Sequence, residues 1–485
     1  MLTKTSINDL KYPIIWSHFK EINAIPRASN NEEAIRNYLV SFGNALGLST
    51  SIDSIGNVII RKSGTRGKED CKPIVLQAHL DMVHVKEPTS DFNFEIQGID
   101  MYVDGDWIKA KETTLGADNG IGVAAIMAVL SSTDLTHPPL EGLFTVDEEL
   151  GMTGAMALTK HQLKGNYLLN LDSEEDDVLT IGCAGGTDVE IMGTYPTQEV
   201  NSHDYICHQI HIKNLNGGHS GVDIHKGTAN AIVVLVELID TLIATTKCRL
   251  QSFHVEALTN VIPSDGTVSL AVHKNKQTLF ATTLREGIER VKRKFQPTDP
   301  NLTIWSTQKK GATTAMDGEF QQHYLMRLLK IPNGVFTMSE SIPDLVQTSN
   351  NIATLTIEKG EYAIKCHVRS SIDSERDALV AQIGDVFPTA NFHSLNSYPG
   401  WTPKVDSRIT AIAIDCYKEL NTIAPDIKSI HAGLECGIIS GVYPQMEMIS
   451  FGPNIRGAHT PEERLQISSV EKFWKFLVKL LETIT

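Results

Sequence analysis

Acidic and imidazole side chains gather in five short clusters of this sequence. The clusters are H-L-D at 79–81, G-A-D-N-G at 116–120, D-E-E-L-G at 147–151, N-L-D-S-E at 170–174 and G-A-H-T-P-E-E at 457–463. Imidazole and carboxylate are the ligands that borderline divalent metals such as zinc, cobalt and manganese take in proteins. Several acids in one cleft would repel each other without cations, so the clusters predict a metal site if they converge.

Two metal ions that share a bridging carboxylate fit this number of ligands. The candidate side chains are His79, Asp81, Asp118, Glu148, Glu149, Asp172 and His459. Asp81 follows His79 by two residues, and in an extended segment both point to the same side, so Asp81 can hold the imidazole N–H. The adjacent Glu148 and Glu149 divide into one general base and one ligand. The sequence contains no H-E-x-x-H and no G-x-S-x-G, which disfavours a thermolysin-type or a serine hydrolase.

The segments that must position these clusters alternate between strand-like and helix-like patterns. Short apolar runs predict strands at 56–61, 73–78, 142–146 and 167–171, and helical spacing predicts a helix at 34–46. Near-continuous apolar strands are typical of a sheet with helices on both faces. Ligands in open α/β sheets gather at the carboxyl ends of the strands, so we expect the five clusters to converge.

The middle of the chain has a different pattern. Alternating strands and helices between about 206 and 397 predict a β-α-β-β-α order that occurs twice. We therefore expect an α/β domain with a mixed sheet from 1–186 and 399–485, interrupted by an α+β domain at 187–398 that is an internally duplicated ferredoxin-like unit. Glycine and proline cluster at both ends of this insertion, near 185–187 and 397–400, and predict hinges there.

Composition excludes several classes of protein. The 485 residues are 41% hydrophobic and 21% charged, as in a globular protein, and the formal charge of −15 argues against nucleic-acid binding. The first residues lack the apolar run of a signal peptide, and the longest apolar stretch, 121–130, is too short to span a membrane. Seven scattered cysteines favour reduced thiols, so we expect a cytoplasmic protein without membrane contact.

The five clusters resemble the metal motifs of the carboxypeptidase G2/aminoacylase clan of dizinc peptidases. Within that clan the chain is most similar to the aminoacyl-histidine dipeptidases, also called cytosol non-specific dipeptidases, and the similarity includes H-A-G-L-E-C-G at 431–437. The resemblance implies a dizinc catalytic domain and makes the inserted domain its lid. It also implies a cis peptide bond between Asp118 and Asn119.

The resemblance assigns a role to each candidate. Asp118 bridges the two metals, His79 and Asp172 complete one site, and Glu149 and His459 complete the other. Glu148 is the general base, and Asp81 supports His79. In the lid, His219 of G-G-H-S-G stabilises the oxyanion, and Asn260 and Arg369 hold the terminal carboxylate of the substrate. The family often has an acid two residues before this arginine, where the present chain has His367.

The expected reaction is hydrolysis of unblocked dipeptides by a dizinc-bound water, with Xaa-His dipeptides and β-alanyl-histidine among the substrates. Cobalt or manganese can replace zinc in such a site. An amino-acid deacylase or a dizinc aminopeptidase would use the same metal ligands, and a non-enzymatic peptide binder would be expected to have lost some of them. Side-chain preference, native metal and oligomeric state stay open, including a homodimer.

Overall fold

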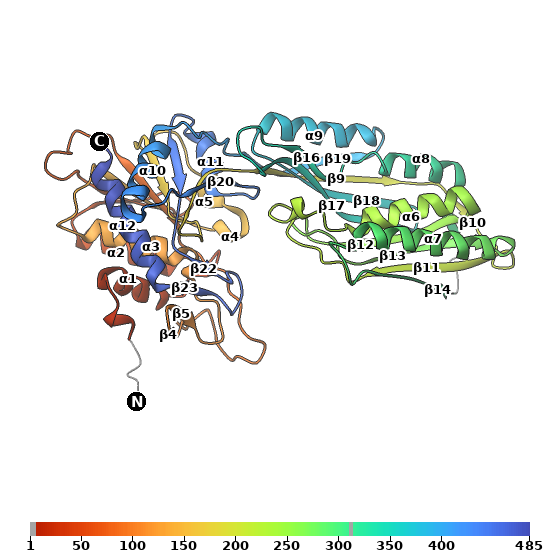
Figure 1. Cartoon of the computed structure of the whole chain (residues 1–485), viewed down its shortest axis with the longest axis horizontal. Helices are drawn as coiled ribbons and strands as arrows, with labels where there is room; N and C mark the ends of the chain where they lie inside the picture. The colour runs from red at the N-terminus through yellow and green to blue at the C-terminus, as the bar shows by residue number, and fades with distance from the viewer. Residues whose placement is uncertain (1–5, 310–313) are drawn as a thin grey trace. The chain divides into compact units, whose positions relative to one another are not determined.

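The computed structural model describes residues 6–309 and 314–485, which form two compact units (Figure 1). The first unit comprises Met1–Gly182, Trp401–Ser429 and Leu434–Thr485, and the second comprises Cys183–Gly400 and Ile430–Gly433. The second unit is thus an insertion in the chain of the first, with one further short segment after Ser429. The domain boundaries that the sequence predicts, at 186/187 and 398/399, stay a prediction.

A mixed eight-stranded sheet is the centre of the first unit. Its strands, in spatial order, are β1 (Ser49–Ile52), β2 (Val58–Lys62), β6 (Leu140–Thr145), β3 (Ile74–His79), β7 (Tyr167–Asn170), β21 (Glu447–Ser450), β8 (Val178–Cys183) and β20 (Asp426–Ile430). The four strands from β6 to β21 are parallel, whereas β1 and β2 pair antiparallel at one end. Every residue of β3 and β6 is buried, as the apolar runs in these segments predict.

Helices and a small second sheet complete the first unit. The helices are η1 (Ile7–Asp9), α1 (Pro13–Asn23), α2 (Glu33–Ala45), α3 (Ala117–Ser131), α4 (Glu148–Gly151), α5 (Thr153–Met156), α10 (Arg408–Asn421), α11 (Glu435–Val442) and α12 (Ile467–Thr483). The small sheet contains β22 (Ile455–Arg456), β23 (Arg464–Gln466), β5 (Trp107–Ala110) and β4 (Met101–Asp104). Helix α3 packs against β3 and α1, and its residues from Asn119 to Leu130 are all buried. This burial explains why the segment is apolar on every side.

A nine-stranded sheet forms the second unit. Its main order is β14 (Thr303–Lys309), β11 (Tyr205–Lys213), β13 (Gly266–His273), β12 (Arg249–Glu256), β17 (Val346–Glu358), β18 (Glu361–Ser370), β9 (Gly185–Thr194) and β19 (Asn391–Tyr398). Strand β16 (Gly334–Met338) pairs with β17, and a separate pair is formed by β10 (Thr197–Glu199) and β15 (Thr314–Met316). The strands and helices of each half of the sheet fit one β-α-β-β-α-β repeat. The internal duplication stays a prediction.

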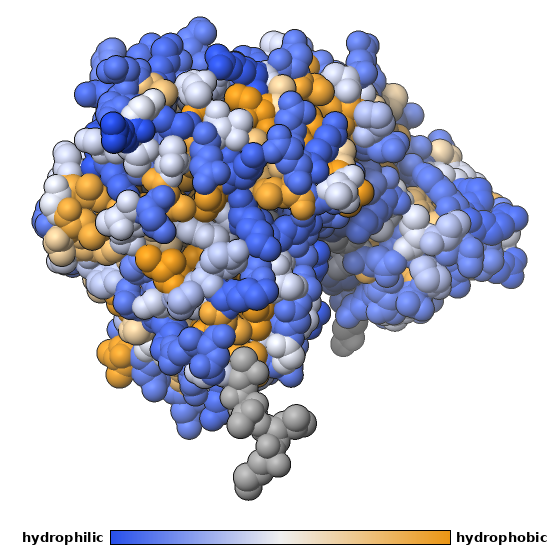
Figure 2. Space-filling view, turned by 60° about the vertical axis from the view of Figure 1, so that its left-hand side comes forward, coloured by the Kyte–Doolittle hydropathy of each residue, from blue (hydrophilic) through white to orange (hydrophobic). Residues whose placement is uncertain are grey.

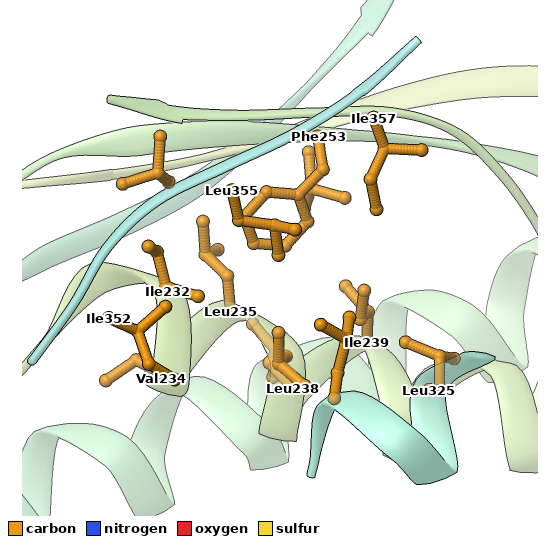
Figure 3. Packing of buried hydrophobic residues seen from close by; sticks show 14 of the residues in the cluster. Ile232, Val234, Leu235, Leu238, Ile239, Phe253, Leu325, Ile352, Leu355 and Ile357 are labelled. Atoms are coloured by element: carbon orange, nitrogen blue, oxygen red, sulfur yellow. The ribbon is translucent and has the colours of Figure 1, made fainter. Parts of the chain in front are cut away.

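The core of the second unit lies between this sheet and its helices. The helices are η2 (Ile224–Lys226), α6 (Ala231–Thr246), η3 (Lys274–Lys276), α7 (Gln277–Phe295), α8 (Gly318–Leu328) and α9 (Asp373–Val386). Figure 3 shows Leu235 and Leu238 of α6 in the same cluster as Phe253 and Leu355 of the sheet. Because side chains alternate along a strand, the residues between the apolar ones point to the opposite face.

The surface matches the composition. The face drawn in Figure 2 is mostly hydrophilic, with apolar side chains in separate patches. Apolar residues exposed singly or in small groups are normal for a globular protein. None of the described helices is long and apolar enough to cross a bilayer.

Candidate metal centre

The five clusters lie at one edge of the parallel strands in the first unit. His79 is the last residue of β3, Glu148 and Glu149 open α4 just after β6, and Asp172 follows β7 by two residues. Strands β6, β3 and β7 are neighbours with parallel register, so their carboxyl ends meet at the same edge. The convergence that was predicted from strand ends is therefore present for these three strands.

Asp118 lies between the two histidines. The Nε2 atom of His79 is 3.1 Å from Oδ1 of Asp118 and 3.3 Å from Oδ1 of Asp172. The Nε2 atom of His459 is 3.4 Å from Oδ2 of Asp118 and 3.0 Å from Oε2 of Glu149. Each oxygen of Asp118 thus approaches a different histidine, which is the arrangement that a bridging carboxylate needs.

These side chains form two groups of possible ligands that share Asp118. One group is His79, Asp118 and Asp172, the other is Asp118, Glu149 and His459, and within each group the ligand atoms lie within 4.8 Å of one another. Two imidazoles and three carboxylates are a donor set that suits zinc, cobalt or manganese. The buried Oε1 atom of Glu149 has no hydrogen-bond partner among the described residues, which leaves it available to a cation. The residues therefore fit two divalent ions.

The electrostatics of the cluster also favour cations. Burial disfavours the charged imidazole of His79, but the carboxylates of Asp172 and Asp118 outweigh it and raise the pKa of His79 well above its usual value. Hydrogen bonds to Asp118 and Glu149 raise the pKa of His459 to about 11. Burial raises the pKa of Asp172 to about 6. Bound metal ions would take the place of these protons, because histidine must be neutral to act as a ligand.

Asp81 supports both the histidine and the glutamate pair. Its Oδ1 lies 3.3 Å from Nδ1 of His79 and accepts the backbone N–H of Glu148 at 3.0 Å, and its Oδ2 accepts the N–H of Glu149 at 3.2 Å. The hydroxyl of Ser29 donates to the same Oδ2 at 2.7 Å. Burial opposes ionisation of Asp81, but the hydrogen bonds and the charge of His79 outweigh it and lower its pKa to about 2. Asp81 is thus an acceptor that orients its neighbours.

Glu148 lies beside the candidate ligands without belonging to either of the two groups that share Asp118. Its carboxylate forms a third close group with His79 and Glu149. Burial raises the pKa of Glu148 well above its usual value, with the nearby Asp172, Glu435 and Glu149 acting in the same direction. A carboxylate with a raised pKa is suited to accept and return a proton.

Two buried residues that the sequence analysis did not single out hold the loop of Asp118. Glu463 is 3% exposed and accepts four backbone N–H groups, from Leu115 at 2.7 Å, Gly116 at 2.9 Å, Ala117 at 2.7 Å and Asp118 at 3.3 Å. Arg27 donates to the carbonyls of Leu80, Asp81 and Gly116, and so joins the loops that carry His79 and Asp118. The peptide bond between Asp118 and Asn119 is cis, which confirms that prediction.

A buried polar layer lies under the strand ends. Glu435, at the start of α11, accepts from the side chain of Gln77 at 2.6 Å and from the hydroxyl of Thr145 at 2.7 Å. Gln77 in turn accepts from the amide of Asn170 at 2.5 Å, so β6, β3 and β7 are joined through their side chains. Glu435 belongs to the motif H-A-G-L-E-C-G at 431–437. Nothing in the spacing of that motif predicts a buried position under the strand ends.

The three candidate substrate residues all lie in the second unit. A β-bridge joins His219 to Val261, and the carbonyl of Asn260 accepts the N–H of Ser220 at 2.7 Å, so the loops of His219 and Asn260 are tied together. Arg369 is 4% exposed on β18, and its charge contributes to lowering the pKa of His219, after the larger effect of burial, to about 4. Position 367, where the family often has an acid, is a histidine in this chain. An acid lies beside it on the neighbouring strand, where Oδ1 of Asp188 is 2.6 Å from Nδ1 of His367.

Comparison with known proteins identifies the family. Residues 75–483 match the model of the peptidase family M20/M25/M40. The chain belongs to the peptidase family M20/M25/M40. The family resemblance, the mixed α/β fold and the assignment as an enzyme are thereby confirmed, and M20 peptidases depend on metal ions.

Individual relatives of the M20/M25/M40 family extend over the whole chain. A cytosol non-specific dipeptidase of Escherichia coli K12 is 35% identical, with 99% of each chain covered. The structure of an aminoacylhistidine dipeptidase from Vibrio alginolyticus has a TM-score of 0.92 at 37% identity and covers 99% of this chain and 98% of that one. An aminopeptidase from Bacillus cereus, at 16% identity and a TM-score of 0.58 with 98% and 99% covered, shares the fold.

Proposed function

We propose that this chain is a cytoplasmic dipeptidase that hydrolyses unblocked dipeptides with two divalent metal ions. The observation that carries the proposal is Asp118, whose two carboxylate oxygens approach His79 and His459 at 3.1 and 3.4 Å. The full-length similarity to the E. coli cytosol non-specific dipeptidase supports the substrate class and the compartment. Similarity to the Vibrio aminoacylhistidine dipeptidase supports Xaa-His dipeptides, β-alanyl-histidine included, as substrates.

The residues of the first unit would hold both ions. His79 and Asp172 would bind one, Glu149 and His459 would bind the other, and Asp118 would be shared between them. Zinc is the first candidate, and cobalt and manganese suit the same donors. Bound divalent ions supply Lewis acidity, which polarises the scissile carbonyl and lowers the pKa of an attacking water.

Glu148 would move the protons of the reaction. Its carboxylate accepts a proton from the attacking water and delivers it to the leaving amine, so one residue acts first as base and then as acid. Asp81 would hold Glu148 in place beside Glu149, since it accepts the backbone N–H groups of both residues. The same carboxylate lies 3.3 Å from Nδ1 of His79 and would orient its imidazole.

The second unit would recognise the substrate. His219 has a lowered pKa and is therefore a neutral donor near pH 7, which suits it to stabilise an oxyanion. Arg369 suits a terminal carboxylate because its guanidinium can donate two parallel hydrogen bonds. Asn260 would complete the carboxylate site with its amide. An anchor of this kind favours dipeptides over longer chains, because the carboxylate must lie one residue from the scissile bond.

The experiment that tests the proposal is a substrate panel. The purified protein is stripped of metal, reconstituted with zinc, cobalt or manganese, and assayed on dipeptides that include Xaa-His and β-alanyl-histidine. N-acetyl amino acids serve as the control substrates, since an amino-acid deacylase would prefer them. Hydrolysis of the dipeptides but not of the N-acetyl amino acids is expected, and the reverse preference would replace the proposal with a deacylase.

A further inference from the structure

Three residues of the second unit lie side by side across neighbouring strands. Arg369 of β18 pairs with Gly186 of β9, and Gly186 pairs with Tyr398 of β19. Val368 and Cys366 of β18 point into the helix-covered core, so Arg369 points to the opposite face of the sheet. The glycine separates the arginine from the tyrosine in the sheet.

Gly186 makes room for the tyrosine ring. A Cβ atom at this position would lie 2.5 Å from the hydroxyl oxygen of Tyr398, 2.6 Å from its Cζ and 2.8 Å from Nε2 of His367. Any side chain at 186 would therefore displace the ring. Because the position is empty, Tyr398 reaches across β9, and its hydroxyl lies 3.1 Å from Nη1 of Arg369.

The direction of this hydrogen bond follows from the chemistry of its two groups. A guanidinium has donors and no acceptor, so Arg369 donates and the phenol oxygen of Tyr398 accepts. The phenol keeps its own proton for a second partner. The main chain of Tyr398 is anchored, since its carbonyl accepts from Nη1 of Arg376 at 2.7 Å. The tyrosine is thus a fixed donor beside a fixed cation.

The charge around Arg369 favours an anion. Arg369 is 4% exposed, and its Nε has no hydrogen-bond partner among the described residues. Burial, with the charge of Arg369, lowers the pKa of His431 to about 3 and that of His219 to about 4, so both imidazoles are neutral. Asp188, two residues along β9 from Gly186, already binds His367 at 2.6 Å and the amide of Asn396 at 2.9 Å.

We propose that Tyr398 is a specificity-determining residue whose hydroxyl donates a hydrogen bond directly to the terminal carboxylate of the substrate that Arg369 binds. The inference rests on the proposed function and adds a second ligand to its carboxylate site. The tyrosine accepts from the arginine and donates to the substrate, so both residues read the same carboxylate. Gly186 is the residue that permits this arrangement.

The test compares dipeptides with the corresponding dipeptide amides, which lack the carboxylate. Tyr398→Phe removes only the hydroxyl and should raise KM for dipeptides about tenfold or more, the range of a hydrogen bond to a charged group, with kcat little changed. The amides should be unaffected. The matched control is Tyr362→Phe, since Tyr362 lies over Gly193 in the same strand pair but on the core side, and it should behave as wild type.

A double variant separates direct contact from an effect through Arg369. If Tyr398 contacts the carboxylate itself, Tyr398→Phe should still raise KM in an Arg369→Ala background. Complete loss of the effect in that background would overturn the proposal, as would equal changes for dipeptides and amides. Gly186→Ala, which displaces the ring, should reproduce the dipeptide-specific rise in KM.

The same experiment distinguishes failure of the proposed function. If the wild type hydrolyses N-acetyl amino acids instead of dipeptides, the dipeptidase proposal fails. The role of Tyr398 is then measured on those acids and their amides, with the same expected result. An unchanged KM for the preferred acid in Tyr398→Phe would refute the inference in either case.

Discussion

Glu463 offers a sharp test of how Asp118, the proposed bridging ligand, is positioned. The two carboxylate oxygens of Glu463 each accept two backbone N–H groups of residues 115–118, the segment that enters α3 and carries Asp118. Burial raises the pKa of Glu463, and the backbone hydrogen bonds oppose this shift. In Glu463→Gln one oxygen becomes an amide NH₂, which faces two N–H groups that it cannot bind. Two hydrogen bonds to a charged acceptor are lost.

The expected cost can be worked from these contacts. A hydrogen bond to a charged group contributes about 1.5–3 kcal/mol, so two of them contribute about 3–6 kcal/mol. Since about 1.4 kcal/mol is a factor of ten, the formed loop should lose about 10²- to 10⁴-fold in population relative to disordered states. The affinity for metal should fall with it, because we propose Asp118 as the ligand that both ions share.

Metal affinity is measured by competition with a chromogenic chelator, and stability by thermal unfolding of the metal-free protein. Glu463→Gln should weaken metal binding by at least about tenfold and lower Tm. The matched control is Glu462→Gln, which changes the exposed neighbour and should leave both quantities unchanged. Wild-type affinity and Tm in Glu463→Gln would refute the reasoning that this carboxylate holds the loop.

Four further outcomes are expected. Glu148→Gln should keep both metals but lose about 10²- to 10⁴-fold in kcat, the usual contribution of a general acid–base group. If elemental analysis shows that the variant has lost metal, Glu148 is a ligand instead. Chelation should abolish dipeptide hydrolysis and zinc, cobalt or manganese should restore it, whereas activity that survives complete removal of metal contradicts a metal-dependent reaction. Arg369→Ala should raise KM at least about tenfold for dipeptides and little for their amides, and equal losses on both would show that it does not read the carboxylate. Glu435→Ala removes the acceptor of one N–H of Gln77 and that of the Thr145 hydroxyl, while Nε2 of Gln77 keeps its hydrogen bond to Oγ1 of Thr145 at 3.1 Å. Each donor left unpaired costs about 1–3 kcal/mol, so urea unfolding should show a loss of about 2–6 kcal/mol that Glu435→Gln reduces. Equal stability of Glu435→Ala and the wild type would contradict the buried layer.

The structure gives a second role to the glycines at the predicted hinge. The hinge near 185–187 stays a prediction, and Gly185 and Gly186 lie at the start of β9, where they pair with β18. A Cβ at Gly185 would lie 2.5 Å from the backbone nitrogen of Gly400, and one at Gly186 would meet Tyr398. Close approach between strands therefore requires glycine here, whether or not the segment is also a hinge. Composition cannot separate this case from flexibility, because both require the absence of a side chain.

The sequence by itself determined the elements of the first unit and the residues at their ends. Continuous apolar runs identify β3, β6 and β7, and His79, Glu149 and Asp172 lie at the end of these strands or within four residues after it. Because parallel neighbours end at the same edge, chain position alone predicts that these residues converge. The motif resemblance added the roles of the individual ligands, which spacing could not assign.

Only the tertiary structure decided which distant side chains support the site. Glu463 accepts the backbone N–H of Leu115 across 348 residues of chain. Every residue except proline carries a backbone N–H, so the residue type at position 115 does not indicate this contact. Tyr398 meets Arg369 only through the register of β18, β9 and β19, which is set by pairing along whole strands. Periodicity reports which face of a strand a residue occupies, but it does not report which strand lies beside it or at which offset. Contacts across strands therefore depend on the assembled sheet, whereas the candidate ligands at strand ends are encoded locally.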